Sequence, residues 1–106
     1  MSERPYEIFR TDKTEEQLAD ILAYLEKTAG NKPVLNLIDQ LEQAFAHLSR
    51  FPYLGVAPRR RTLAGRGYRM LVVGRYLLFY KVDEARRRII VYGIFYGAQD
   101  LSLIHI

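Results

Sequence analysis

Four side chains in the second half of the chain carry the groups that phosphate chemistry requires. They are Arg69, Arg75, Tyr80 and Lys81, within a stretch rich in tyrosine, valine and leucine. A cluster of arginine, lysine and tyrosine is able to polarise a phosphate and to stabilise a pentacoordinate transition state by charge, without histidine. Strand arginines and tyrosines are more often solvated or turned toward a protein partner. The sequence leaves both interpretations open.

Several other kinds of site are excluded by composition. The chain has two histidines, His47 and His105, and no cysteine, so a disulfide framework, a thiolate metal site and a histidine-rich metal site are not expected. Gly65-Arg66-Gly67 is a lone GxG ahead of a strand, whereas phosphate-binding glycine loops follow a strand and open a helix. We therefore expect no metal and no cofactor. No apolar run approaches the roughly 18 residues of a membrane span, and no signal peptide is evident, which favours a cytoplasmic protein without a membrane partner.

Basic residues are concentrated in one part of the sequence. Residues 58–88 hold ten lysines and arginines and two acidic residues, whereas residues 1–57 hold six lysines and arginines and nine acidic residues. Arg59, Arg60 and Arg61 are consecutive. Such a block attracts an acidic partner through long-range electrostatic steering, although arginines in turns also serve simply to keep strand edges soluble.

The stretch from Gly67 to Tyr96 predicts a three-stranded antiparallel meander. Its runs GYRMLVV, YLLFYKV and RIIVYGIFY are dominated by residues that prefer strands. Gly74-Arg75 suits a two-residue hairpin turn, and the polar residues 83–86 suit a second, longer reversal. Alternation along the middle strand puts apolar residues on both faces. One face carries Tyr76, Leu78, Tyr80 and Val82, and the other carries Leu77 and Phe79.

The first half predicts a strand and two helices. Residues 6–11 favour a short strand, and Thr14 with Gln17 matches a capping box at the start of a helix. Apolar residues at helical spacing follow in two stripes, with Gly30 or Asn31 ending the first helix and Pro33 in the first turn of the second. We expect about three residues between the helices, and a loop over residues 52–66. The fold class is therefore α+β: a short N-terminal strand and a two-helix hairpin packed on an antiparallel sheet completed by the meander.

The chain fits one small domain over residues 1–100. The last six residues, LSLIHI, do not continue the pattern and match what one reading frame of a sequencing-library transposon end would encode. We interpret residues 101–106 as a non-native tail, with a genuine apolar terminal strand as the alternative, and give His105 no functional role.

Together these residues resemble the RelE/ParE superfamily of type II toxin–antitoxin modules. The resemblance rests on YEIFRT, DILAYL, LSRFPYLG, GYRMLVVGRYLLFYKVD and GAQDL, which stand in the family's order and cover residues 6–101. The ending of Tyr96 to Leu101 is similar to the HGARDL ending of the ParE branch. It departs at Tyr96, where histidine is common, and at Gln99, where arginine is common; Gly93 also replaces a frequent arginine.

The resemblance implies a toxin, often encoded in plasmid-stabilisation modules, that a cognate antitoxin neutralises with an extended, partly acidic segment. ParE-like members poison DNA gyrase, and RelE-like members cleave mRNA on the ribosome. An important arginine of the RelE branch would fall at Leu77, which favours the ParE branch and an inhibitor that is not an enzyme.

Three functional hypotheses follow. The leading one is a ParE-like gyrase inhibitor, with surface contacts to target or antitoxin at Arg59, Arg60, Arg61, Arg69, Arg75 and Tyr76, and with Phe79 and Tyr80 as further candidate anchors. The second is an endoribonuclease, ribosome-dependent or free, that uses Arg69, Arg75, Tyr80 and Lys81. The third is a remnant that binds an antitoxin and inhibits nothing.

Overall fold

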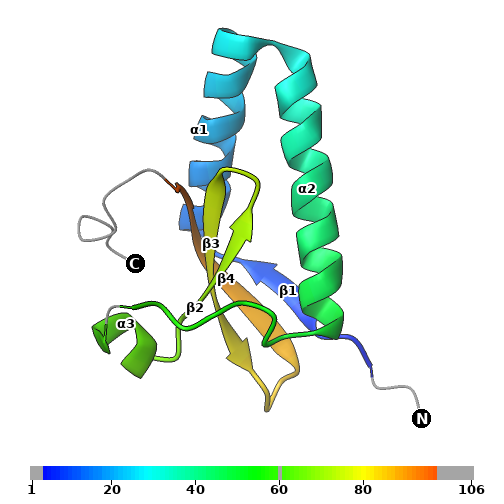
Figure 1. The fold of residues 1–106 in the computed structure, drawn as a ribbon. Helices are drawn as coiled ribbons and strands as arrows, with labels where there is room; N and C mark the ends of the chain where they lie inside the picture. The colour runs from blue at the N-terminus through cyan, green and yellow to red at the C-terminus, as the bar shows by residue number, and fades with distance from the viewer. Residues whose placement is uncertain (1–3, 60, 98–106) are drawn as a thin grey trace.

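The computed structural model describes residues 4–59 and 61–97. Its elements follow in the order β1 (Glu7–Arg10), α1 (Asp12–Ala29), α2 (Asn31–Arg50), α3 (Arg61–Gly65), β2 (Arg69–Val73), β3 (Tyr76–Asp83) and β4 (Arg88–Tyr96) (Figure 1). The predicted α+β class, the first strand, the helical hairpin and the C-terminal meander are confirmed. Within the described ranges, no helix is long and apolar enough to cross a membrane.

The four strands form one sheet in the order β1-β4-β3-β2. The meander β2-β3-β4 is antiparallel, as predicted. Strand β1 pairs with β4 in the parallel sense, a detail that the sequence did not predict. Val73 pairs with Tyr76 across the two-residue turn, where Gly74 has a φ of 59°; a positive φ is what a primed hairpin turn requires.

Strand β4 contains a bulge opposite the middle of β3. Phe79 pairs with Gly93 and Tyr80 pairs with Val91, so Tyr92 is the extra residue. The bulge reverses the alternation of side chains along β4. As a result Val91 and Ile94, three residues apart, both lie in the core on the helix-covered face.

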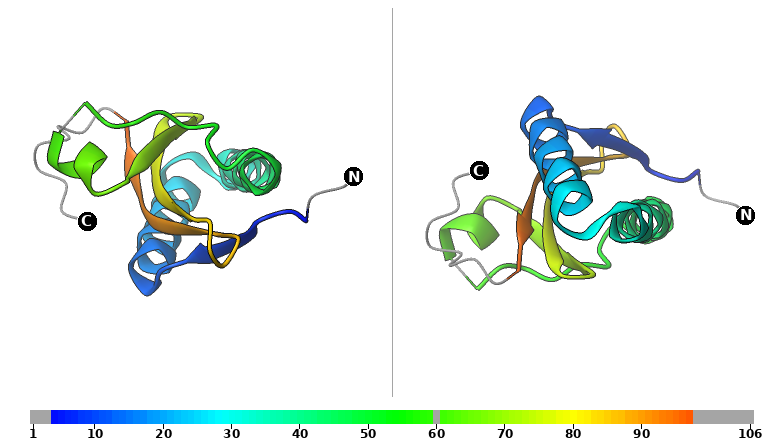
Figure 2. Two further views of the ribbon diagram at one scale, coloured as in Figure 1. Left: turned by 90° about the horizontal axis from the view of Figure 1, so that it is seen from below. Right: turned by 90° about the horizontal axis from the view of Figure 1, so that it is seen from above.

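The core lies between the sheet and both long helices. Figure 2 shows α1 and α2 on the same side of the sheet. The predicted division of β3 into two faces is confirmed, and the helices cover the face of Tyr76, Leu78, Tyr80 and Val82, of which Leu78 and Tyr80 belong to the buried cluster. The buried cluster consists of Leu37, Leu41, Ala44, Leu48, Val73, Leu78, Tyr80, Ile89, Val91 and Ile94. On the opposite face, the ring of Phe79 meets that of Phe95 edge-on, with centroids 5.7 Å apart.

The predicted capping box of α1 is wrong. Helix α1 begins at Asp12, and its cap is Thr11, whose side chain accepts a hydrogen bond from the Thr14 amide at 3.2 Å. The Thr14 hydroxyl instead donates to the Val91 carbonyl at 2.9 Å, and Gln17 Oε1 accepts from the Ile94 amide at 3.1 Å. Both side chains bond the sheet because β1 ends at Arg10, which leaves the outer edge of β4 open beyond Val91.

The connections also differ from the expectation. One residue, Gly30 at a φ of 86°, separates α1 from α2, because a glycine in this conformation reverses the chain at once. Residues 52–66 are not entirely loop. Val56 forms an antiparallel bridge with Met70, and α3 occupies Arg61–Gly65. The suspected tail, residues 101–106, lies outside the described ranges.

Thr14→Val should destabilise the protein by about 1–3 kcal/mol, because the Val91 carbonyl loses a buried hydrogen bond while the side-chain shape is kept. The measurement is urea unfolding followed by far-UV circular dichroism. Thr28→Val is the matched control, since the Thr28 hydroxyl also bonds a carbonyl of α1, that of Tyr24, but on the exposed surface. We expect the control to change stability by less than about 0.5 kcal/mol; equal losses would contradict a specific role for the Thr14 bond.

Candidate partner-binding surface

Two of the three arginines expected to meet an acidic partner lie around the start of α3, Arg61 as its first residue and Arg59 just before the helix. Arg59 and Arg61 are both exposed. Arg60 lies outside the described residues. Their exposure fits a role in attracting a partner, because charges on the surface act over about 10 Å at ordinary ionic strength.

Arg69 is turned inward and holds the segment that follows α2. Its Nη2 donates to the carbonyl of Tyr53 at 3.1 Å and to that of Gly55. Its guanidinium carbon lies 5.2 Å from the centre of the Tyr53 ring. The hydroxyl of Tyr53 bonds Glu84, and this bond raises the pKa of Tyr53 to about 12. The Arg69 guanidinium is thus held against the protein by two backbone carbonyls and the Tyr53 ring.

Tyr80 holds the same segment, the one that follows α2, from the side of the core. Its side chain is wholly buried, and its hydroxyl accepts the Gly55 amide at 2.9 Å. A Cβ at position 55 would lie 2.6 Å from the Met70 carbonyl oxygen and 2.8 Å from the Tyr80 hydroxyl. Glycine is therefore the only residue that fits between the segment and β2 without a shift of the backbone.

Lys81 lies on the opposite face of the sheet. Its Nζ stands 4.4 Å from the Tyr68 ring centre and 5.5 Å from that of Tyr92. Burial raises the pKa of Tyr68, and the neighbouring Tyr92 raises that pKa further. Lys81 is therefore stabilised over two aromatic rings by cation–π attraction.

A groove separates the α1–α2 hairpin from the turn between β2 and β3. Its volume is about 860 Å³, and its lining includes Ile21, Tyr24 and Leu25 of α1 and Arg75, Tyr76 and Tyr96 of the sheet. The rings of Tyr76 and Tyr96 meet edge-on at 5.9 Å, and burial raises the pKa of Tyr76. The groove brings the predicted residues Arg75 and Tyr76 together.

Sequence reasoning missed the contribution of α1 to this groove. Tyr24 is 67% exposed and stands beside the apolar stripe of the helix rather than within it. An exposed aromatic residue next to a stripe was the available signal, since such residues are enriched where proteins meet.

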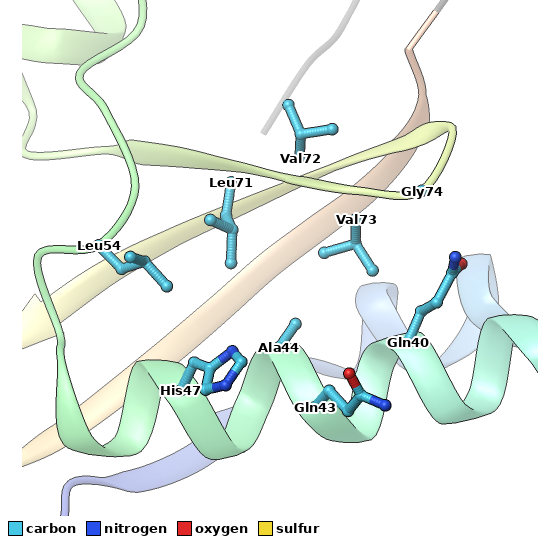
Figure 3. A pocket seen from close by; sticks show the side chains of 9 residues that line it. All are labelled: Gln40, Gln43, Ala44, His47, Leu54, Leu71, Val72, Val73 and Gly74. Atoms are coloured by element: carbon cyan, nitrogen blue, oxygen red, sulfur yellow. The ribbon is translucent and has the colours of Figure 1, made fainter.

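A smaller cavity of about 370 Å³ lies between α2 and β2. In Figure 3 the side chains of Ala44 and His47 rise from the helix toward Leu71 and Val73 of the strand. Gln40 and Gly74 line both this cavity and the larger groove. The two hollows are therefore neighbours along α2.

The four residues of the endoribonuclease hypothesis do not share one site. Tyr80 is buried under the helices, Lys81 is on the opposite face, and Arg69 is bound to backbone carbonyls. Arg75 stands in the turn between β2 and β3, where it lines the groove.

A model of the ParE toxin family of type II toxin–antitoxin systems, parDE, matches residues 8–101. The chain belongs to this family. No curated protein matches the sequence.

Solved toxin structures share the fold of this ParE-family chain. One is from the chromosomal ParDE system of P. aeruginosa, with a TM-score of 0.67 and 15% identity, covering 86% of this chain and 95% of that one. Another is from the RelBE2 toxin–antitoxin complex of Mycobacterium tuberculosis, with a TM-score of 0.62 and 24% identity, covering 87% of this chain and 98% of that one. A third, a YoeB/ParE toxin from Agrobacterium tumefaciens, has a TM-score of 0.58 and 15% identity, covering 85% of this chain and 96% of that one.

The structure gives a physical reason for one departure of this ParE-family chain from the family's pattern. A Cβ at Gly93 would lie 2.6 Å from Cε2 of Phe95 and 3.3 Å from Gln17 Oε1. The Phe95 ring therefore occupies the space that an arginine at position 93 would need. Tyr96, the second departure, lines the groove, and Gln99 lies outside the described ranges.

Tyr80→Phe should lower the free energy of unfolding by about 1–3 kcal/mol, because it leaves the buried Gly55 amide without its acceptor. Denaturant unfolding measures the loss, and amide exchange at Gly55 should accelerate in parallel. Tyr24→Phe is the control, since it removes a hydroxyl from an exposed tyrosine. An unchanged exchange rate at Gly55 would show that the Tyr80 hydroxyl does not hold the segment.

Proposed function

We propose that this chain is a ParE-like toxin that inhibits DNA gyrase and is kept inactive by a cognate antitoxin. The observation that carries the proposal is the family match over residues 8–101. Two of the similar structures come from systems named for a toxin and an antitoxin together, RelBE2 and ParDE, which supports an antitoxin partner here. The setting is the cytoplasm, where gyrase works, and plasmid stabilisation is the corresponding biological role.

The side-chain arrangement favours an inhibitor over an RNA-cleaving enzyme. Charge stabilisation of a phosphoryl transition state needs donors aimed at one point. Tyr80 and Lys81 lie on opposite faces of the sheet, and the Tyr80 hydroxyl already accepts a backbone amide. The groove beside Arg75 and Tyr76 offers instead an apolar surface with a charged rim, which is typical of protein recognition.

We expect the purified protein to abolish gyrase supercoiling of plasmid DNA and to leave mRNA intact in a parallel sample with translating ribosomes. The full chain and a chain ending at Asp100 should inhibit equally, because we propose residues 1–100 as the toxin unit and residues 101–106 as a tail outside it. Arg75→Glu should weaken inhibition about tenfold or more if the groove rim contacts gyrase.

Two other outcomes are informative. Cleaved mRNA with unaffected gyrase would overturn the proposal in favour of an endoribonuclease, and single substitutions at Arg69 and Lys81 would then locate its site. A protein that affects neither sample but binds the antitoxin would be a remnant without toxicity.

The basic start of α3 should speed antitoxin binding. We expect Arg59→Glu/Arg61→Glu to slow association about tenfold at low salt, with a smaller effect at high salt, because steering is screened by ions. Stopped-flow mixing with the antitoxin encoded beside this chain measures the rate. Lys27→Glu/Lys32→Glu is the matched control, since it reverses two exposed charges near the far end of the helical hairpin and gives the same net charge. Equal slowing by both variants would assign the effect to net charge alone.

A further inference from the structure

Basic residues gather at the end of the molecule opposite the tip of the helical hairpin. Figure 1 shows the start of β1, the end of α2 and the turn between β3 and β4 together at this end. The Tyr6 amide donates to the Ser49 carbonyl at 2.8 Å, and the Ser49 hydroxyl donates to the Tyr6 carbonyl at 2.6 Å. The Glu7 amide donates to the Arg87 carbonyl at 3.0 Å. The three joined segments carry four arginines, which we call the basic end: Arg4, Arg50, Arg86 and Arg87.

The backbone of Arg87 has a conformation that arginine rarely adopts. Its φ is 49°, in the left-handed region that favours glycine. The side chain that replaces a glycine here is well placed. Its Nη2 donates to the Arg4 carbonyl, and its guanidinium carbon lies 4.6 Å from the centre of the Tyr6 ring. The turn thus holds a positive charge at its junction with β1 although a glycine would fit the backbone better, and such a conformation often marks a functional residue.

The charges of the basic end are not neutralised within the described ranges. None of its four guanidinium groups forms a salt bridge with a described residue. The nearby acidic residues have other neighbours. Asp83 pairs with Arg88 at 3.1 Å, Glu84 accepts a hydrogen bond from the Tyr53 hydroxyl, and Glu7 stands opposite Arg88 in the β1–β4 pairing. The basic end therefore offers its positive charge to an external anion.

Arginines cover the tyrosine rings at this end. Arg87 lies over Tyr6, and the guanidinium carbon of Arg69 is 5.2 Å from the centre of the Tyr53 ring. Proteins that bind single-stranded nucleic acids need a run of free ring faces on which successive bases stack. Phe51 is exposed, but a single ring gives no such run. Guanidinium groups match phosphate oxygens in geometry, so the arrangement favours backbone phosphates over unpaired bases.

The shape of the basic end favours a large polyanion. Neither the groove nor the small cavity is lined by any of its four arginines, so a ligand meets an open surface. A small anion on such a surface would contact one or two arginines. Duplex DNA carries one negative charge per about 1.7 Å of helix axis, and its two strands would bring phosphates to arginines on all three segments at once.

We propose that the basic end binds the phosphate backbone of double-stranded DNA. The inference goes beyond the proposed function, because it gives the chain a DNA contact of its own that needs no second protein. Phosphate contacts carry no sequence information, so the binding is independent of sequence. A gyrase inhibitor with this property would hold the gyrase–DNA complex at two surfaces, one on the enzyme and one on the DNA.

Fluorescence anisotropy of a labelled 20-base-pair duplex tests binding by the full chain alone. Four phosphate contacts predict that log K falls with log salt concentration with a slope of about −3.5. Arg50→Gln/Arg86→Gln should weaken binding about tenfold or more at low salt and reduce the slope by about two. Lys27→Gln/Lys32→Gln is the matched control, since it removes two exposed positive charges near the tip of the hairpin. Equal weakening by both variants would assign binding to net charge and overturn the proposal.

Arg87→Gly tests the held arginine without endangering the fold. Glycine suits the φ of 49°, so relief of the backbone offsets the lost contact with Tyr6, and the thermal midpoint should change little. Binding to the duplex should weaken about threefold or more, because one phosphate contact is lost. A folded variant that binds DNA as tightly as wild type would overturn the role of Arg87.

Other ligands and other sites are distinguished in the same assay. A single strand of the same sequence should bind more weakly than the duplex; tighter binding would indicate base stacking and overturn the choice of duplex DNA. Arg59→Gln/Arg61→Gln should retain most of the binding, and its selective loss in this variant would move the site to α3 and overturn the basic end. A duplex that does not bind, with Arg50→Gln/Arg86→Gln still losing gyrase inhibition, would make the basic end a protein contact.

The inference and the proposed function fail separately. A chain that inhibits gyrase but does not bind the duplex would overturn the inference and leave the proposed function standing. A chain that binds the duplex through the basic end but does not inhibit gyrase would overturn the proposed function and leave the inference standing.

Discussion

The outer edge of β4 sets the arrangement of the whole fold. Strand β1 covers this edge only as far as Val91, and buried backbone groups beyond that point need other partners. The first turns of α1 supply them. The Val91 carbonyl accepts from the Thr11 amide at 3.1 Å and from the Thr14 hydroxyl at 2.9 Å, and Gln17 accepts from Ile94. Helix α1 is therefore fixed along β4, and α2, one residue after its end, has little freedom in where it packs.

The need of the β4 edge for partners also separates the features that the sequence predicted from those that it did not. The meander, its turn at Gly74, the two helices and the division of β3 into two faces follow from alternation, helical spacing and turn residues, all of which are local. Thr14 and Gln17 also fit a local rule, that of the capping box, but the sheet needs both side chains. The misplaced cap is therefore a case in which a tertiary contact overrides a local preference. The parallel pairing of β1 and the bulge at Tyr92 are likewise set by distant partners.

The sequence predicted which residues belong to the candidate site better than it predicted how they are arranged. Charge and residue type pointed to the arginines, and the structure divides them by role. Arg59 and Arg61 are exposed, Arg75 borders the groove, and Arg69 holds a loop from within. Neither hollow along α2 could be predicted, because both arise from how far the helical hairpin stands from the sheet. That separation depends on packing between residues far apart in the sequence.

The bulge in β4 also bears on which aromatic side chain the groove presents. With Tyr92 inserted, Ile94 and Tyr96 share the helix-covered face and Phe95 stacks edge-on with Phe79 behind it. If the same residues paired without the bulge, strict alternation from Val91 would put Phe95 on the groove side and Tyr96 on the other. Deletion of Tyr92 would instead remove the bulge and leave Gly93 opposite Phe79 and Tyr96 opposite Tyr76, so the groove would keep its tyrosine. The bulge therefore lets β4 carry one residue more than β3 without changing which side chains the groove presents.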